Sequence, residues 1–164
     1  RIYAVEQKLD ALLNIPGDAP MRVTGRIDRI DYHPDLGWRL IDFKSSDSGT
    51  SPDKAHRKGD RWIDLQLPLY RGLHAAQLPG APDAADIATG YFLVGADPAK
   101  IGFTPSKRID ELQQDAMDAA VEVVRDIRLG HFDHLGDPPW EGDPIALVQR
   151  SQTLGADDEG GADE

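Results

Sequence analysis

Two short segments decide the fold that this sequence predicts: Gly-Arg-Ile-Asp at residues 25–28 and Leu-Ile-Asp-Phe-Lys at residues 40–44. Both read as strands, and the Pro and Gly in the segment between them indicate a turn, so we expect an antiparallel hairpin. Its strands carry Asp28, Asp42 and Lys44 at positions where a purely structural strand would carry valine. The hairpin therefore predicts a functional site as well as a fold.

The hydrophobic pattern on either side of the hairpin supplies the rest of an α/β domain. It predicts strands over residues 2–13, 21–32, 38–45 and 87–94, and helices over residues 61–77 and 105–129. Residues 46–58, rich in Ser, Gly, Asp and Pro, predict a loop. Pro68 predicts a kink or a second start of the first helix, and Gly130 the end of the second. We expect a mixed central sheet flanked by helices.

Composition places the chain among soluble globular proteins. It has 164 residues, of which 40% are hydrophobic and 29% charged, as in an ordinary single domain. We expect one domain over residues 1–150 and a disordered acidic tail over 151–164. No signal peptide and no run of about 20 apolar residues is present, which predicts a cytoplasmic protein without a membrane partner. The absence of cysteine excludes disulfides, thiolate zinc sites and cysteine-ligated iron–sulfur clusters.

The charge of the chain is uneven. A net charge of −11 argues against a protein that coats nucleic acid electrostatically, but five of the acids lie within residues 155–164. Conversely, four basic residues crowd the segment that follows the hairpin: Lys54, Arg57, Lys58 and Arg61. This segment is either a solvated charged loop or a place of phosphate contact.

The acids of the hairpin are suitable ligands for a divalent cation. Asp28 and Asp42 lie 14 residues apart on two strands joined by a turn, and carboxylate oxygens suit Mg²⁺ or Mn²⁺. Lys44 shares a strand face with Asp42, so it would place an ammonium beside the metal, where it could orient a water. The alternative is a surface hairpin with a cross-strand ion pair of little energy.

Three motifs in order give the chain a family resemblance. They are residues 25–31 (GRIDRID), residues 40–45 (LIDFKS) and residues 64–70 (DLQLPLY). Their order and spacing resemble the PD-(D/E)XK nuclease superfamily, and most closely its RecB/AddB-type and CRISPR-associated exonuclease domains. The resemblance implies a restriction-endonuclease-like fold, a mixed sheet flanked by helices.

The resemblance also implies roles for individual residues. It makes Asp28, Asp42 and the backbone carbonyl of Phe43 ligands of Mg²⁺ or Mn²⁺, and Lys44 the catalytic lysine. Gln66 and Tyr70 match the helix motif that supports the site and contacts DNA in the family, and Lys54, Arg57, Lys58 and Arg61 would hold the phosphates of the strand. Many relatives carry an iron–sulfur cluster near the carboxyl end, which this cysteine-free chain cannot hold.

From this resemblance we expect a magnesium-dependent deoxyribonuclease, an exonuclease rather than an endonuclease. It would act in recombination or double-strand-break repair as a domain of a larger protein, together with a helicase domain or subunit. Relatives often supply a His or Glu from an upstream helix, and the sequence begins after that point without Met, as a fragment would. A catalytically inactive DNA-binding or scaffolding domain is the alternative, and hydrolysis of RNA or of a nucleotide also stays open.

Overall fold

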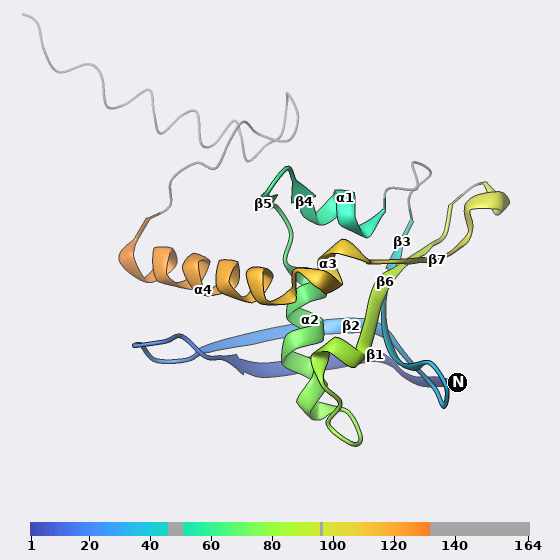
Figure 1. Cartoon of the computed structure of the whole chain (residues 1–164), viewed down its shortest axis with the longest axis horizontal. Coiled ribbons are helices and arrows are strands. Elements are labelled where there is room, and N and C mark those ends of the chain that lie inside the picture. The colour runs from blue at the N-terminus through green and yellow to red at the C-terminus, as the bar shows by residue number, and fades with distance from the viewer. Residues whose placement is uncertain (46–50, 96, 132–164) are drawn as a thin grey trace, which may run out of the picture. The chain divides into compact units, whose positions relative to one another are not determined.

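A computed structural model describes residues 1–45, 51–95 and 97–131. Among these residues, five strands form one sheet in the order β1 (Ile2–Leu13), β2 (Met21–His33), β3 (Gly37–Lys44), β6 (Ile87–Leu93) and β7 (Gly102–Pro105). Neighbouring strands are antiparallel except β3 and β6, which are parallel. The sheet is therefore mixed, as predicted (Figure 1).

The compact unit that holds this sheet comprises Arg1–Gly130. The boundary predicted between residues 150 and 151, and the tail beyond it, lie outside the described residues. Within the described ranges, no helix is both long and apolar enough to cross a membrane.

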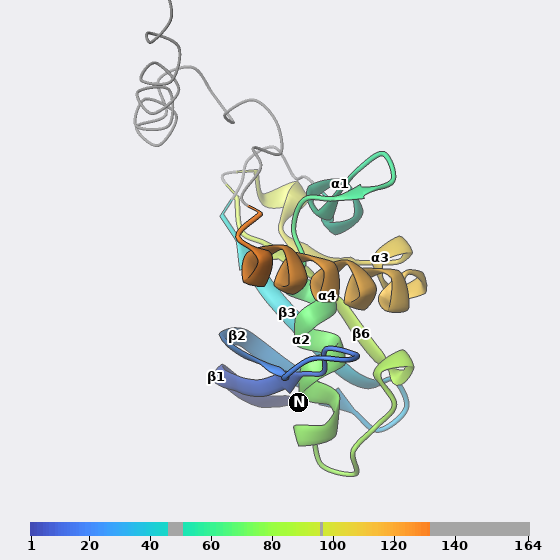
Figure 2. The ribbon, with the colours of Figure 1, turned by 90° about the vertical axis from the view of Figure 1, so that its left-hand side faces the viewer.

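The parallel pair requires a long crossover, because parallel neighbours cannot be joined by a tight turn. The crossover contains α1 (Pro52–His56), the short strands β4 (Arg57–Lys58) and β5 (Arg61–Trp62), and α2 (Gln66–His74). Two 3₁₀ turns, Ala75–Gln77 and Ala84–Asp86, then lead into β6. The crossover places α2 across one face of the sheet (Figures 1 and 2).

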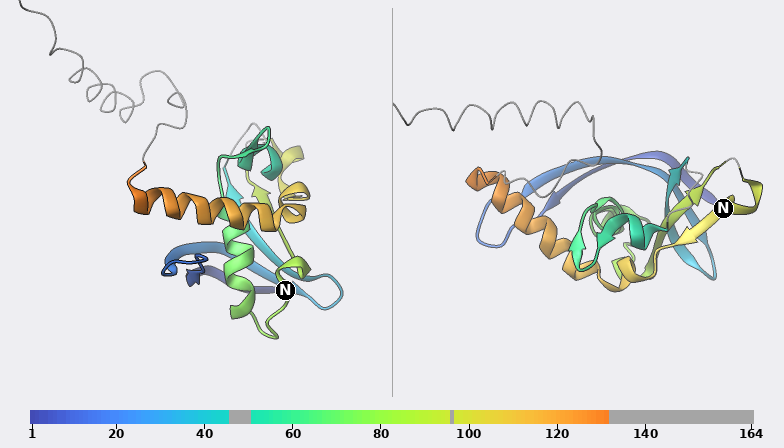
Figure 3. Two further views of the ribbon diagram at one scale, coloured as in Figure 1. Left: turned by 60° about the vertical axis from the view of Figure 1, so that its left-hand side comes forward. Right: turned by 90° about the horizontal axis from the view of Figure 1, so that it is seen from above.

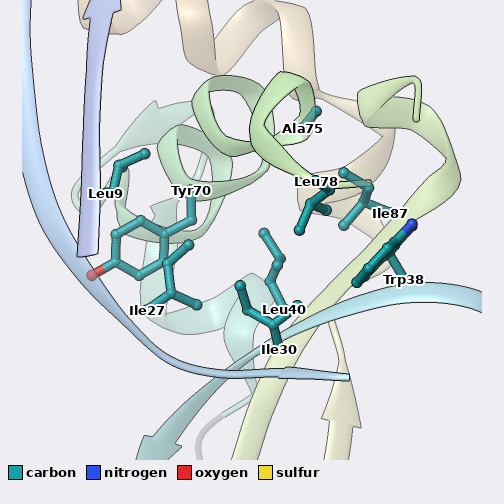
Figure 4. Close-up of a cluster of buried hydrophobic side chains, with 9 residues drawn as sticks. All are labelled: Leu9, Ile27, Ile30, Trp38, Leu40, Tyr70, Ala75, Leu78 and Ile87. Carbon is teal, nitrogen blue, oxygen red and sulfur yellow. The ribbon is translucent and has the colours of Figure 1, made fainter. Parts of the chain in front are cut away.

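The core lies between α2 and this face of the sheet. Figure 4 shows the side chains that fill it: Leu9, Ile27, Ile30, Trp38, Leu40, Tyr70, Ala75, Leu78 and Ile87. A second cluster, which includes Leu13, Ile15, Ala120 and Val124, joins the far end of the β1–β2 ribbon to α4 (Gln113–Leu129). Burial of these side chains, at about 25 cal/mol per Å² of apolar surface, is the main force that holds α2 against the sheet.

Helix α2 is shorter than predicted, and its proline explains the start. The expected helix over residues 61–77 begins at Gln66, because residues 61–62 form β5 instead. Pro68 lies in the first turn, where backbone N–H groups have no acceptor within the helix, so it causes no break. The Asp64 carboxylate accepts the Gln66 N–H at 2.7 Å and so satisfies one of the free donors of that turn.

The helix predicted over residues 105–129 is divided into separate elements, which corrects that prediction. Residues 102–105 form β7, a short helix α3 (Arg108–Glu111) follows, and Leu112 with φ −100° and ψ 23° separates it from α4. The apolar pattern continued through this break because α3 and α4 both bury apolar residues, although against different neighbours. Gly130, with φ 72°, ends α4 as predicted.

The loop predicted over residues 46–58 is also wrong in part. Residues 46–50 lie outside the described residues, but Pro52–His56 form α1 and Arg57–Lys58 form β4. The sequence carries a signal for the start of this helix, because Pro52 occupies the first helical position and Asp53 lies in the first turn. Asp53 also accepts a hydrogen bond from Ile109 N at 3.1 Å, which ties α1 to α3.

A buried arginine joins α2 to α3 and to the turn before β6. Arg71 is 4% exposed and donates hydrogen bonds to the carbonyl oxygens of Ala84, Ala85 and Asp110 at 2.6, 3.0 and 2.7 Å. Its Nη1 also lies 3.7 Å from the Asp110 carboxylate. That carboxylate accepts hydrogen bonds from two hydroxyl groups, Thr89 on β6 at 2.8 Å and Ser106 at 3.2 Å.

Candidate active site

Strands β2 and β3 diverge where the acids of the hairpin lie. The last backbone pair of this ladder is Arg29 with Ile41. Beyond it, the Asp28 carboxylate accepts the N–H of Phe43 at 2.7 Å, a role that a backbone carbonyl would have in a continued ladder. The Asp28 side chain is thus held against the β3 segment that contains Asp42 and Lys44.

An irregularity in β2 brings Asp28 to this position. Ile27 and Ile30 are both completely buried in the same cluster, although residues three apart point to opposite faces of a regular strand. On the paired strand β1, Glu6 lies between the partners of Ile27 and Arg29 and has a left-handed φ of 51°. The change of face therefore falls between Ile27 and Ile30, where the register with β1 also shifts, between Ile2 and Ala4. Local irregularities of this kind commonly re-aim a side chain beside an active site.

Asp42 and Lys44 form an ion pair on the face of β3 that α2 covers. The Lys44 Nζ lies 2.8 Å from Asp42 Oδ2 and 5.0 Å from the centre of the Tyr91 ring. Tyr91 is the neighbour of Asp42 in the parallel β3–β6 register. Asp42 is 4% exposed, whereas the Lys44 side chain is 37% exposed, so the ammonium group connects a buried carboxylate to the surface.

The Asp42 carboxyl group is not fully satisfied by the protein. Among the described residues, its Oδ2 has no hydrogen-bond partner of acceptable geometry in spite of the ion pair with Lys44. Burial raises the pKa of Asp42; Lys44 opposes this shift, and the negative charges of Asp28 and Asp64 add to it. A cation placed between the acids would relieve both the missing contact and the repulsion.

The donor set of this site is suited to a hard divalent cation. Carboxylate and carbonyl oxygens are the ligands that Mg²⁺ and Mn²⁺ prefer, and the unsatisfied Asp42 oxygen is a buried acceptor for such an ion. In residues 1–45, 51–95 and 97–131, no three His, Asp or Glu side chains are arranged to hold a metal. A metal here would therefore need backbone or water oxygens beside the two carboxylates, as Mg²⁺ sites commonly provide.

Gln66 and Tyr70 share one face of α2, as predicted from their spacing. The Gln66 side-chain amide donates to the Tyr70 hydroxyl at 3.0 Å, and this hydroxyl donates to the carbonyl oxygen of Arg26 at 2.6 Å. A Cβ atom on Gly25 would lie 3.2 Å from the Tyr70 ring, so only glycine gives the ring its space without displacement. The Tyr70 ring therefore holds β2 two residues before Asp28, which joins the first and third motifs physically.

The four basic residues after the hairpin have different environments. Lys54 lies on α1, Lys58 on β4 and Arg61 on β5, and all three are exposed. Arg57 is different, because its side chain is only 7% exposed and faces the carboxylates of Asp60 and Asp115, each at 3.6 Å. Its charge is thus directed toward protein carboxylates.

Three residues beside the acids had not been identified from the sequence: His56, Asp64 and Tyr91. The His56 Nδ1 donates to the Asp64 carbonyl oxygen at 2.9 Å, and the His56 ring lies 5.8 Å from that of Tyr91. Burial, then the charges of Asp64 and Asp42, raises the pKa of Tyr91, and burial lowers that of His56. Asp64 begins the third motif, two residues before Gln66, and His56 lies in the basic segment, but their place beside the acids was not predicted because α1 was expected to be a loop.

Comparison with known families identifies the fold that holds this site. A family model described as the PD-(D/E)XK nuclease superfamily matches residues 1–139. The chain belongs to the PD-(D/E)XK nuclease superfamily. The mixed sheet with α2 on one face agrees with the restriction-endonuclease-like α/β fold expected from the motifs. Neither a curated protein nor a solved structure matches the chain.

Members of this superfamily are generally nucleases that use divalent metals such as Mg²⁺ or Mn²⁺. This family property agrees with the oxygen-rich donor set between β2 and β3. The match is to the superfamily as a whole and does not distinguish its RecB/AddB-type branch from the others.

Proposed function

We propose that this chain is a metal-dependent DNA nuclease in which Asp28 and Asp42 hold Mg²⁺ or Mn²⁺ and Lys44 positions the attacking water. The observation that carries the proposal is the convergence of these three side chains where β2 and β3 diverge. The Asp28 carboxylate is held by Phe43 N–H at 2.7 Å, and Lys44 lies 2.8 Å from the unsatisfied Asp42 oxygen. The backbone carbonyl of Phe43 is the third proposed ligand.

Hydrolysis of a phosphodiester forms a P–O bond to a water oxygen and breaks the P–O bond to the leaving sugar oxygen, which takes up a proton. A bound metal supplies Lewis acidity and lowers the pKa of water. Lys44 is suited to orient the water, because its ammonium is confined between the Asp42 carboxylate and the Tyr91 ring yet stays partly exposed. The same positive charge stabilises the additional negative charge of the transition state.

The substrate and setting follow from the motif resemblance. Lys54, Lys58 and Arg61 are exposed on α1 and the β4–β5 hairpin, where they contact phosphates of the DNA strand. Gln66 and Tyr70 support the site from α2 and lie near the bound strand. We assign the chain to the RecB/AddB-type branch, as an exonuclease in recombination or double-strand-break repair that acts with a helicase domain or subunit.

A cleavage assay on the full chain tests the nuclease. End-labelled single- and double-stranded DNA and a matching RNA are incubated with and without Mg²⁺. We expect shortened DNA products only with Mg²⁺, and Lys44→Ala lowers the rate by about 10²- to 10⁴-fold, the usual contribution of a group that positions or transfers a proton. Lys8→Ala is the matched control, because Lys8 is an exposed β1 lysine whose side chain is 72% exposed.

Two results would contradict this proposal. The first is cleavage by Lys44→Ala at the rate of the unchanged protein. The second is an absence of Mn²⁺ binding in calorimetric titration of the unchanged protein, which would favour the inactive nuclease fold. Preferential cleavage of the RNA would support the proposed site but show that the substrate is RNA.

A further inference from the structure

The face of the sheet that lies opposite α2 carries a row of aromatic side chains. Side chains alternate between the two faces along β3, so the Phe43 ring lies opposite the acid and the lysine of the proposed active site. The register pairs Phe43 with Phe92 on β6, and Phe92 with Phe103 on β7, so the three rings share one face. In the view from above in Figure 3, teal α1 and gold α3 lie on one side of the blue arc of β1 and β2. We call these three residues and Arg39, which lies on the same face of β3, the aromatic face.

The neighbouring side chains hold the rings of the aromatic face in place. The Phe43 and Phe92 rings meet edge to face, with their centres 5.6 Å apart. A Cβ atom on Gly90 would lie 2.7 Å from the Phe103 ring, so this glycine leaves the space in which that ring lies. The Arg39 guanidinium lies over the same ring, 4.3 Å from its centre. Phe43 nevertheless stays 42% exposed, so it offers a preorganised aromatic surface to a ligand.

Basic side chains surround this aromatic surface. Within residues 1–45, 51–95 and 97–131, no carboxylate forms an ion pair with the Arg39 guanidinium. By contrast, Arg29 on the same side of the sheet donates to both carboxylate oxygens of Asp31, each at 2.8 Å. Lys8 and Arg26 are cross-strand neighbours further along this side, with side chains 72% and 69% exposed. Exposed aromatic rings beside cations are the combination that binds unpaired nucleic acid, because the rings stack on bases and the cations attract phosphates.

The aromatic face meets the proposed active site at Phe43. The N–H of Phe43 donates to the Asp28 carboxylate at 2.7 Å, and its carbonyl oxygen is the third proposed metal ligand. Phe43 and Arg39 are four residues apart on β3, a distance of about 13 Å at 3.3 Å per residue. A DNA strand whose phosphate is held at the metal site can therefore continue past the end of β3 onto this face.

We propose that the aromatic face binds an unpaired segment of the DNA substrate, with one base stacked on Phe43 and a phosphate bound by Arg39. The proposal rests on the nuclease function proposed above, which supplies the DNA ligand. Duplex DNA does not suit this face, because its bases stack on one another and leave no ring surface for Phe43. A second copy of this chain does not suit it either, because a symmetric contact would bring two Arg39 guanidinium groups toward each other.

Binding without cleavage tests the stacked base, with the full chain in EDTA. The probes are fluorescent oligo(dT) and its duplex with oligo(dA), and we expect the single strand to bind more tightly. Phe43→Leu keeps an apolar side chain and the backbone carbonyl, and should weaken oligo(dT) binding about tenfold, the usual loss for one stacked base. Ile127→Ala is the matched control, because Ile127 is 45% exposed on α4, and its affinity should not change.

The salt dependence of binding tests the phosphate contact separately. Each phosphate neutralised on a single strand contributes about 0.7 to the slope of log affinity against log salt concentration. Arg39→Met should therefore lower this slope for oligo(dT) by about 0.7, and Arg39→Lys, which keeps the charge, should restore it. Phe43→Leu should lower the affinity and leave the slope unchanged, because it removes a ring and no charge.

Photochemical crosslinking tests the contact on the unchanged protein, so it does not depend on the folding of a variant. Oligo(dT) in which thymines are replaced by 5-iododeoxyuridine is bound in EDTA and irradiated, and this base attaches to aromatic side chains that stack on it. We expect mass spectrometry of the digested protein to find the nucleotide on Phe43. Crosslinks found only on peptides outside the aromatic face would overturn the proposal.

Two further outcomes overturn it. One is a folded Phe43→Leu variant that binds oligo(dT) as tightly as the unchanged protein. The other is a loss of self-association in sedimentation of Phe43→Leu with DNA binding unchanged, which would assign the face to contacts between copies. Failure of the nuclease proposal is seen separately in the Mg²⁺ cleavage assay. A chain that binds oligo(dT) through Phe43 but cuts no DNA keeps the aromatic face and loses the nuclease.

Discussion

Two carboxylates of this protein, the buried Asp42 on β3 and the partly buried Asp110 on α3, differ in their surroundings. Asp110 accepts hydrogen bonds from Thr89 and Ser106 and lies beside Arg71, which is itself fully engaged with backbone carbonyls. Asp42 lies beside Lys44, and its Oδ2 receives no hydrogen bond from the described residues. Burial raises the pKa of both carboxyl groups.

The difference agrees with a structural role for Asp110 and with the role of metal ligand proposed for Asp42. A structural carboxylate gains its stability from donors within the chain, so the surroundings of Asp110 leave little for an outside group to supply. Among the described residues, the Asp42 Oδ2 is paired only with a partly exposed ammonium, so a bound cation could add a contact there. Removing each group should therefore have opposite consequences for activity and for stability.

The largest effect is expected from Asp42→Asn. Because the side chain is a proposed metal ligand, cleavage of DNA in Mg²⁺ should fall on the order of 10³-fold or more. Stability should stay the same or increase, because burial disfavours the charged form of Asp42 and raises its pKa, and the partly exposed Lys44 can be hydrated once its partner is neutral. Initial cleavage rates and urea denaturation measure the two quantities. A folded variant with unchanged activity would place the metal elsewhere.

A large loss of stability is expected from Arg71→Met. The substitution removes three hydrogen bonds to backbone carbonyls and leaves Asp110 without its cation, which should lower the free energy of unfolding by about 3 kcal/mol. Arg22→Met is the control, because it removes an exposed ion pair with Asp10 and should change stability little. Similar denaturation midpoints for both variants would contradict a structural role for Arg71.

A smaller effect is expected from Tyr70→Phe, which keeps the ring and removes its hydrogen bonds to Arg26 and Gln66. Loss of these two hydrogen bonds, one of them to a backbone carbonyl oxygen, should lower the free energy of unfolding by about 1 to 2 kcal/mol. Activity should fall less than for Asp42→Asn, because Tyr70 acts by holding β2. Tyr3→Phe on the exposed part of β1 serves as control. Weaker DNA binding at unchanged stability would indicate that the hydroxyl contacts the substrate directly.

The smallest effect is expected in the pH dependence of stability. Burial raises the pKa of Asp110 above 3.8, with the hydrogen bonds from Thr89 and the charge of Arg71 opposing the shift. The folded chain then binds this proton more tightly than the unfolded chain, so its contribution to stability is complete below pH 3.8 and is lost as pH rises through the raised pKa. Asp110→Asn should flatten this part of the curve in urea denaturation across pH, and an unaltered slope would contradict the shift.

The sequence predicted the hairpin, the spacing of its acids and the Gln66–Tyr70 face because these depend on neighbours along the chain. Strand alternation and helical spacing encode them directly. The sequence could not predict the division at Leu112, because the apolar pattern continues while α3 and α4 pack against different elements. It also missed His56 and Asp64, whose position beside Tyr91 depends on the crossover returning to β6.

The orientation of Asp28 on its irregular strand also could not be predicted from the sequence. The sequence placed this acid on a strand, but the change of face between Ile27 and Ile30 accompanies two irregularities of β1, the left-handed Glu6 and the register shift between Ile2 and Ala4. Glu6 is not glycine, so its conformation gave no signal in the composition. Gly25, by contrast, is part of the first motif. The structure explains why this position is glycine, because the Tyr70 ring packs against it.

The sheet register also sets an order for the folding of the site. Arg29 on β2 pairs with Ile41, 12 residues later, whereas Trp38 on β3 pairs with Ile87, 49 residues later. Closing the shorter loop costs less chain entropy, so the hairpin that brings Asp28 and Asp42 together can form before β6 arrives. Burial of Asp42 beside Tyr91 then comes late. During synthesis, we expect the acids to stay hydrated until β6 (Ile87–Leu93) has been made, and the buried environment that raises the Asp42 pKa to be complete only when the crossover closes.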